Sequence, residues 1–253
     1  MEPWRTIGTL TLIFRGEIGE CVGKGFQGAV LRALGAKEHL ATVTRIEWIS
    51  SAVVRLDFVS ETLLYPDGEQ PSAWIRAWFP DVDGGSKQYQ RGYTLADPDP
   101  ATGTFGIYFL VHQPAGPASN WAVNATPGDE LVMQRMGGDG WELENPQPAG
   151  YLLVGDVASW PGIASIIAAA PHGVAVRAFL EYTHDDDPQL SIPDHPDLEV
   201  TWVPRRPDGR ALVDALGDDD YRGWKSWVAV ESTATRLVRS KLTGDHGHNK
   251  GTM

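Results

Sequence analysis

Apolar and polar residues alternate along residues 41–134, which is the pattern of β-strands with one buried face. Strands are predicted where apolar residues recur at every second position, at 40–49, 54–58, 73–79, 104–112 and 130–134. The intervening Asp97-Pro98-Asp99-Pro100 predicts a turn between strands. Several short strands separated by turns favour a small antiparallel barrel.

The pattern changes beyond residue 146, where continuous apolar runs alternate with helical segments. Tyr151-Leu152-Leu153-Val154 is such a run and is typical of a buried parallel strand. Further strands are predicted at 174–182, 198–203 and 227–230, and helices at 161–170 and 232–242, the second with Ser232 as its N-cap. This alternation predicts an α/β unit built on a parallel sheet.

The two patterns together predict an α+β chain of two domains. Gly137-Gly138-Asp139-Gly140 and Pro146-Gln147-Pro148 are predicted to join them, because both segments are rich in residues that end regular structure. We place a leader at 1–24, an antiparallel β-barrel domain at 25–145 and an α/β parallel-sheet domain at 146–253.

A short helix is predicted over residues 25–35, where Phe26, Val30 and Leu34 share one face. Basic residues make the segment 24–37 locally positive in an otherwise acidic protein. Two interpretations stay open: a helix packed on the barrel, or a surface that docks on a membrane or a larger assembly.

Composition and charge narrow the class of protein. The 253 residues carry a formal net charge of −12, so a nucleic-acid partner is not expected. The single cysteine, Cys21, excludes an internal disulfide and a cysteine-based metal cluster. No apolar run reaches the roughly 20 residues needed to span a bilayer. These features indicate an ordinary globular domain in a reducing compartment.

The segment Arg91-Gly92-Tyr93-Thr94 has the residue types of a flavin site. The guanidinium of Arg91 can pair with a phosphate, the ring of Tyr93 can stack on a flat heterocycle, and the hydroxyl of Thr94 can hydrogen-bond its edge. The alternatives are a surface arginine, ordinary core packing for the tyrosine, and simple strand propensity for the threonine.

A second segment, following shortly after, supplies backbone donors. Gly116, Pro117, Ala118 and Ser119 are predicted to open a helix, whose free N–H groups can cradle a diphosphate. His112 precedes this turn and can contact the flavin or its diphosphate, or serve a structural role at a strand end. The sequence leaves both roles open, and it favours core packing for Trp121.

The chain resembles the siderophore-interacting proteins, which are flavin-dependent ferric-siderophore reductases on a ferredoxin-reductase-like plan. The resemblance rests on five segments in the family's order, of which the Gly-Pro-Ala-Ser-x-Trp-Ala stretch is the most specific. They are Arg91-x-Tyr93-Thr94, His112 with 116–122, Pro127-Gly128-Asp129, Leu152 to Pro161, and Trp227-Val228-Ala229-x-Glu231. The head of the chain, around 25–39 and 73–80, looks like the cytoplasmic siderophore-interaction domain of mycobacterial ABC importers of mycobactin.

This resemblance implies further site residues at the carboxyl ends of the parallel strands, where ligands of α/β sheets bind. Asp156 and Ala158 follow the first such strand, and Glu231 follows the last. Glu231 has a second reading as an acid at a helix start. The segment is no Gly-x-Gly-x-x-Gly fingerprint, so spacing alone does not establish nucleotide binding.

The implied activity passes electrons from NAD(P)H through FAD to a ferric, mycobactin-like siderophore. It requires no resident metal and no acid–base residue. The implied partners are a transmembrane ABC transporter domain and, through residues 24–37, a membrane surface; the location is the cytoplasm or the cytoplasmic face of the inner membrane. A non-catalytic siderophore-binding module and a general flavin or quinone reductase remain as alternatives.

Other charged clusters receive simpler interpretations. Asp185-Asp186-Asp187 is predicted to be a solvated loop, and His246 and His248 a polar tail without metal-ligand spacing. Two features depart from the family: Leu95-Ala96 stand where a second arginine is often found, and an aromatic carboxyl-terminal tail is absent from this sequence.

Overall fold

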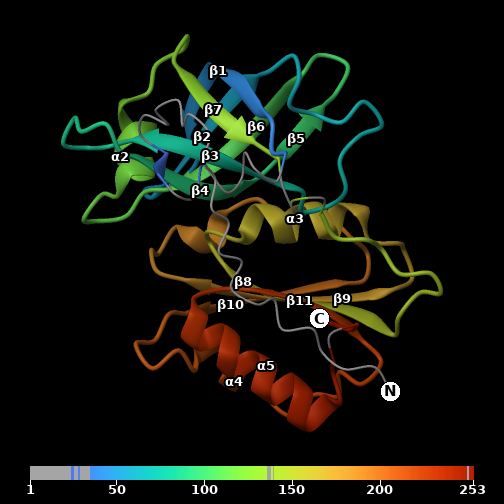
Figure 1. Ribbon diagram of the computed structural model, residues 1–253. Helices are drawn as coiled ribbons and strands as arrows, with labels where there is room; N and C mark the ends of the chain where they lie inside the picture. The colour runs from blue at the N-terminus through green and yellow to red at the C-terminus, as the bar shows by residue number, and fades with distance from the viewer. Residues whose placement is uncertain (1–23, 26–27, 29–34, 136–137, 139, 250) are drawn as a thin grey trace, which may run out of the picture.

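The computed structural model of the protein describes all residues except 1–23, 26–27, 29–34, 136–137, 139 and 250 (Figure 1). The predicted leader and most of the predicted helix over 25–35 therefore lie outside the described residues. Within the part of the chain that is described, no helix combines the length and apolar character needed to cross a membrane.

The first domain is a curled antiparallel sheet of seven strands in the order β4-β3-β7-β1-β2-β6-β5. Its core is the enclosed face, where Phe58, Phe79 and Phe105 lie with almost no exposure because the apolar residues of each strand alternate inward. The strands are β1 (Glu38–Trp48), β2 (Val53–Val59), β3 (Trp74–Pro80), β4 (Gln88–Thr94), β5 (Ala96–Asp99), β6 (Thr104–Leu110) and β7 (Glu130–Gln134).

The turn predicted at 97–100 was placed too early. Residues Ala96–Asp99 form the short strand β5, which pairs with β6 through Ala96 and Gly106. Pro98 is tolerated because β5 is the edge strand of the sheet, where a missing N–H breaks no ladder on the outer side. The chain turns only afterwards, at 100–103.

The second domain is a four-stranded parallel sheet in the order β10-β9-β8-β11. Helix α3 lies on the face toward the curled sheet, and α4 and α5 cover the opposite face (Figure 1). The predicted architecture of an antiparallel barrel-like domain followed by an α/β domain is confirmed. The elements are β8 (Gly150–Asp156), α3 (Trp160–Ala169), β9 (Ala175–Tyr182), β10 (Leu198–Pro204), α4 (Ala211–Leu216), β11 (Lys225–Ala229) and α5 (Ser232–His246).

The last helix differs from its prediction at both ends. Glu231, not Ser232, is the N-cap, since its carboxylate accepts a hydrogen bond from the backbone N–H of Thr233 at 2.8 Å. The helix continues to His246, which is buried, as is His248. The ring of His248 contacts the Ser226 hydroxyl at 3.0 Å and the Tyr221 carbonyl at 2.8 Å. The predicted polar tail is therefore wrong.

The two domains pack directly on one another. The ring of Tyr108 on β6 meets Trp160 at the start of α3 edge-on, with 4.7 Å between centroids. Asp186 accepts hydrogen bonds from the backbone N–H and hydroxyl of Ser51 at 2.6 and 2.8 Å, and Asp187 is fully buried. Asp186 is therefore part of the interdomain contact, and Asp187 is buried within the second domain, where it accepts hydrogen bonds from the backbone N–H groups of Thr183 and His184. The prediction of a solvated loop holds for the exposed Asp185 and is wrong for the other two.

Candidate functional site

A pocket of about 490 Å³ lies between the two domains and brings most of the predicted site residues together. Strand β4, the end of β6 and helix α2 (Pro117–Asn124) line it from the first domain. The turn before α3 and the end of β11 line it from the second. The predicted residues at its wall are Arg91, Tyr93, Thr94, His112, Gly116, Pro117, Ala118, Ser119 and Ala158. We call it the β4–α2 pocket.

Arg91 places a positive charge at this pocket that no described carboxylate neutralises. It lies on the edge strand β4 and is exposed, and its Nη1 donates to the Gln90 carbonyl at 2.7 Å. No acidic side chain within the described residues forms an ion pair with it. A guanidinium left free in this way is suited to a bidentate contact with a phosphate.

Tyr93 presents a half-buried ring to the same pocket. Its centroid lies 4.6 Å from that of Phe109 and 5.9 Å from that of Phe79, so core aromatics fix its position from behind. Burial raises the pKa of its hydroxyl well above the ordinary value. Thr94, the next residue, is half-buried and lies opposite Trp74 of the neighbouring strand β3. The strand thus brings a flat ring and a hydroxyl-bearing residue to the wall of the same pocket.

The start of α2 offers backbone donors to the pocket. Gly116 is the N-cap and supplies no side-chain hydrogen bond, and Pro117 occupies the first turn, as is common there. The buried Ser119 hydroxyl donates to the Leu110 carbonyl at 3.3 Å. The backbone N–H of Ser119 precedes the first intrahelical hydrogen bond, which the Asn120 N–H donates to the Gly116 carbonyl at 2.9 Å. The His112 ring is anchored to the Pro114 carbonyl at 2.8 Å beside this turn.

The second domain contributes the turn between β8 and α3. Gly155 is required here because an added Cβ would lie 2.2 Å from the Ser159 hydroxyl and 2.7 Å from Ile163. Asp156 accepts a hydrogen bond from the Ser159 N–H at 3.1 Å, while Ser159 Oγ accepts from the Asp156 N–H at 2.8 Å. Asp156 therefore shapes the turn that brings Ala158 and Ser159 to the pocket, and it does not itself line the pocket.

Three carboxylates gather at the carboxyl edge of the parallel sheet, outside this pocket. Glu181 on β9 lies directly beside Asp156 on β8. The negative charge of Glu231, which follows β11, contributes to raising the pKa of Glu181. Burial raises the pKa of Glu181 and of Asp156, whereas hydrogen bonds from Ser232 and from the Thr233 N–H lower the pKa of Glu231.

Glu181 was not among the predicted site residues. It is only 3% exposed, and its Oε1 has no hydrogen-bond partner, while Oε2 lies 3.7 Å from Arg205 Nε. The signal in the sequence was an acid at the penultimate position of a parallel strand whose other residues, apart from Arg177, are apolar. Sequence reasoning also missed Ser72, Tyr108 and Trp227, whose side chains become pocket walls only when the domains meet.

The residues of the β4–α2 pocket suit FAD. An unneutralised guanidinium and an uncapped helix start can hold a diphosphate, and the neighbouring tyrosine face can receive a flat ring system. Among the described residues, no group of three or more His, Cys, Asp or Glu side chains is arranged to hold a metal ion.

Two protein-family models match the chain, one in each half. The siderophore-interacting FAD-binding domain matches residues 37–139, and the siderophore-interacting protein model matches residues 148–253. The first match contains the pocket residues contributed by β4 and α2, and the second contains the turn that precedes α3.

Curated relatives at about 40% identity carry the name mycobactin import ATP-binding/permease protein IrtA. The protein of Mycobacterium tuberculosis is 40% identical over 230 residues, and that of Mycolicibacterium thermoresistibile is 41% identical over 232 residues. Each alignment covers 90% of this chain, which spans about a quarter of the relatives' length (27% and 25%).

Solved structures share the fold at lower identity. The siderophore-interacting protein of Acinetobacter baumannii aligns with a TM-score of 0.74 at 20% identity, covering 86% of this chain and 88% of the other. The ferredoxin reductase of carbazole 1,9a-dioxygenase aligns with a TM-score of 0.65 at 16% identity, covering 86% and 68%. The fold is therefore that of the ferredoxin reductases. From the family matches and the IrtA relatives, the chain belongs to the siderophore-interacting protein family and carries that family's FAD-binding domain.

Proposed function

We propose that this chain is an FAD-dependent ferric-siderophore reductase, which passes electrons from NAD(P)H through FAD to Fe(III) and releases Fe(II). The observation that carries the proposal is the β4–α2 pocket, where Arg91, Tyr93 and the start of α2 meet between two domains of a reductase-type fold. Bound FAD would supply two-electron acceptance and one-electron release.

The residues of the chain would bind and orient the cofactor. Arg91 and the N–H groups of Ala118 and Ser119 would hold the diphosphate, and Tyr93 would pack against the flat ring. Thr94, adjoining that ring, would hydrogen-bond its edge. Ala158 and Ser159 would close the pocket from the second domain, on the side where a nicotinamide nucleotide approaches a parallel sheet.

Electron transfer to iron needs no proton donor at the metal, so a general acid or base is not required of the chain. Siderophores built from hard oxygen donors hold Fe(II) far more weakly than Fe(III), so reduction alone releases the ion. The role of the protein in this proposal is to exclude water from the flavin, position it and admit the iron complex.

The name of the relatives supports a proposal about where the chain acts and which siderophore it receives. We propose that the chain acts on a mycobactin-like siderophore delivered by an ABC importer, on the cytoplasmic side of the membrane. Residues 24–37 would contact the transporter or the membrane surface. The ATP-binding and permease functions in the relatives' name would reside in other parts of the importer.

A second candidate, a non-catalytic flavin-containing module that captures the siderophore, is favoured by one observation. The carboxyl edge of the parallel sheet carries Asp156, Glu181 and Glu231 close together. Arg205, 3.7 Å from Glu181, offsets part of their charge, and the remaining excess of carboxylates at that edge would disfavour the diphosphate of a pyridine nucleotide. Failure of both NADH and NADPH to reduce the bound flavin would support this module.

The test is an anaerobic titration of the FAD-loaded protein, followed by absorbance. NADH or NADPH is added first, then a ferric siderophore together with a chelator that traps Fe(II). The proposal predicts bleaching of the flavin, then recovery of its absorbance with two trapped Fe(II) per nucleotide oxidised, since each nucleotide delivers two electrons.

Either of two results would overturn the proposal. Bound flavin that neither nucleotide bleaches would establish the binding module, and a protein that retains no FAD would remove both candidates. In the same titration Arg91→Ala should retain less FAD. Its matched control is Arg45→Ala, which removes an exposed arginine already paired with Glu47 on β1 and should behave as the wild type.

A further inference from the structure

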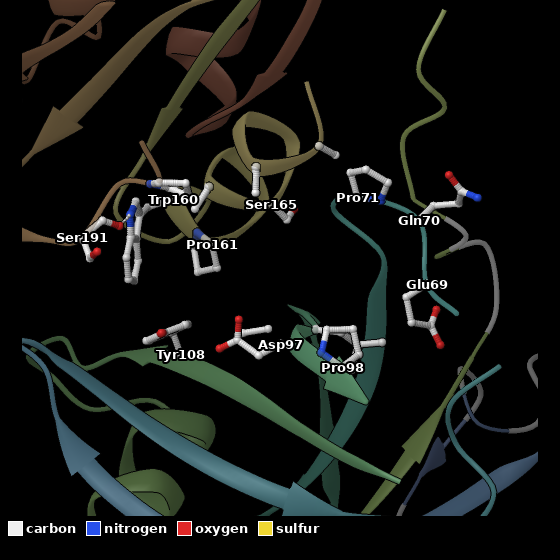
Figure 2. A pocket seen from close by; sticks show the side chains of 16 residues that line it. Glu69, Gln70, Pro71, Asp97, Pro98, Tyr108, Trp160, Pro161, Ser165 and Ser191 are labelled. Carbon is white, nitrogen blue, oxygen red and sulfur yellow. Dashed lines mark hydrogen bonds between the residues drawn. The ribbon is translucent and has the colours of Figure 1, made fainter. Parts of the chain in front are cut away.

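A second pocket, of about 580 Å³, adjoins the β4–α2 pocket and shares two of its wall residues, Tyr108 and Pro161. Figure 2 shows it between helix α3, which carries Trp160, Pro161 and Ser165, and the segment with Asp97 and Pro98 at the edge of the curled sheet. We call it the α3–β5 pocket. Nothing in the proposed flavin site uses it.

We propose that the α3–β5 pocket binds the apolar part of an uncharged iron chelate, and thereby selects the acceptor that receives electrons from the flavin. The inference rests on the proposed function, because it names the class of substrate for that reaction. Its position follows from the shared wall, since an acceptor seated there lies against the flavin pocket.

The face of α3 that lines the pocket is built from small residues. Ala164, Ser165 and Ala168 point toward the pocket, while Ile163, Ile166 and Ile167 on the other face are fully buried in the second domain. The alanines leave the space that larger side chains would fill. Most of the remaining wall is apolar, with Trp160, Leu95, Pro71, Pro98 and Pro193.

The charges at the wall are compensated within the protein. Both carboxylate oxygens of Glu69 accept hydrogen bonds from Arg135, at 2.5 and 2.7 Å, and Asp97 pairs with Arg55 at 2.7 Å. No lysine, arginine or histidine occurs among the described residues that line this pocket. An anionic chelate would thus meet acids without a free cation, whereas a neutral one would meet no unpaired charge.

Backbone strain provides an independent reason to regard this pair of pockets as functional. Ser72 and Asp97 are the two non-glycine residues with positive φ, at 56° and 46°, in the described part of the chain. Ser72 lines the β4–α2 pocket and Asp97 the α3–β5 pocket. The Ser72 N–H donates to Ser165 Oγ on α3 at 2.7 Å, which holds the wall between them. Strained residues of this kind cluster at ligand sites.

The test compares two neutral chelates with the same iron coordination. Ferric tris(acetohydroxamate) and ferric tris(hexanohydroxamate) differ only in their alkyl chains. We expect FAD-loaded wild-type protein to reduce the hexanoyl complex with a kcat/KM about 10-fold higher than the acetyl complex, because each buried methylene contributes roughly 0.8 kcal/mol and only part of the chains enters the pocket.

Two variants fill the pocket, and a third is the matched control. Ala164→Leu and Ala168→Leu should bring kcat/KM for the hexanoyl complex down to that of the acetyl complex in the same variant, without changing FAD affinity. Ser240→Leu adds the same side chain at an exposed position of α5, outside both pockets, and should retain the 10-fold preference.

Three outcomes overturn the inference: a wild type without chain preference, a preference that survives both leucine variants, or loss of FAD from those variants. If the wild type reduces neither complex, the proposed function fails on its own. The inference is then decided by quenching of Trp160 fluorescence, judged against a Trp160→Phe variant. Chain-dependent affinity that the leucine variants abolish supports the pocket, and chain-independent affinity overturns it.

Discussion

The two adjoining pockets share a wall but differ in their charge. The β4–α2 pocket presents a guanidinium without an acidic partner and an uncapped helix start, so it is suited to an anion. The α3–β5 pocket contains two acids, each already paired with an arginine, and a mostly apolar lining. In the proposals made above, this difference would divide one interdomain cleft between a charged cofactor and an uncharged acceptor.

The division depends on which arginines are already paired. Arg55 and Arg135 are engaged by carboxylates, whereas Arg91 keeps its charge available at the other pocket. The charge that each pocket presents to a ligand therefore depends on these ion pairs. The predictions below act on these pairs and on the rings beside them.

The largest effect is expected from Arg135→Met. This change leaves the Glu69 carboxylate, which is 2% exposed, without its bidentate partner. Breaking a buried pair in this way costs about 3–5 kcal/mol of unfolding free energy. Urea denaturation measures the loss, and Arg206→Met, which breaks an exposed pair with Asp214, should stay within about 1 kcal/mol of the wild type. Equal effects of the two changes would show that the Glu69 pair is not buried.

Arg91→Ala should weaken FAD binding by roughly 10- to 100-fold, because a charge-assisted hydrogen bond contributes about 1.5–3 kcal/mol. Stability in the absence of FAD should hardly change, since the arginine is exposed and contacts only a neighbouring carbonyl. Quenching of flavin fluorescence on binding gives the affinity. An unchanged dissociation constant would place the diphosphate elsewhere and remove the contrast between the pockets.

Two substitutions of Tyr93 separate the contributions of its ring and its hydroxyl to FAD affinity. Tyr93→Phe keeps the ring against Phe109 and should leave FAD affinity within about twofold. Tyr93→Leu removes the aromatic face and should weaken binding by roughly 2- to 10-fold, from the 0.5–1.5 kcal/mol of an aromatic contact. The same titration measures both, and a larger effect of the phenylalanine change would contradict the stacking role.

The smallest effects concern the acidic edge of the parallel sheet and have opposite signs. Burial raises the pKa of Glu181 in the folded state. Its contribution to the free energy of unfolding is therefore present below its pKa in the unfolded chain, about 4.3, and is lost as the pH rises through its folded-state pKa. The pKa of Glu231 is lowered by its capping hydrogen bonds, so its contribution is present above the unfolded value and is lost as the pH falls through the folded pKa.

Urea denaturation of Glu181→Gln and Glu231→Gln between pH 3 and pH 8 separates these contributions. Relative to the wild type, Glu181→Gln should gain stability as the pH rises, and Glu231→Gln should gain stability as the pH falls. Parallel pH profiles for the two variants would contradict the assignment of one carboxylate to a buried edge and the other to a helix cap.

The fold was largely predictable because each half has its own period. Alternation predicted β1, β2, β3 and β7, and the apolar run at 151–154 predicted the central parallel strand β8. The strand β4 was not predicted as a strand, since Gln88–Thr94 lies at the edge of the sheet and contains no buried apolar stripe. Helix α4 was also missed, because its six residues are too few to show a period.

The site was predictable only where it is local in sequence. The segments 91–94 and 116–119 each carry several pocket residues in one short stretch, and they meet at one pocket. Ser72, Tyr108 and Trp160 become walls only through packing between domains, and no pattern along the chain marks them. Asp186 and Asp187 show the same limit, since a run of acids gives no sign that one contacts Ser51 and the next is buried.

The most direct test of the account is a crystal structure of the FAD-loaded protein. We predict the diphosphate between Arg91 and the start of α2, the flavin ring beside Tyr93, and no part of the cofactor among Ala164, Ala168 and Asp97. Flavin or adenine density in the α3–β5 pocket would contradict the division of the cleft into a cofactor site and an acceptor site.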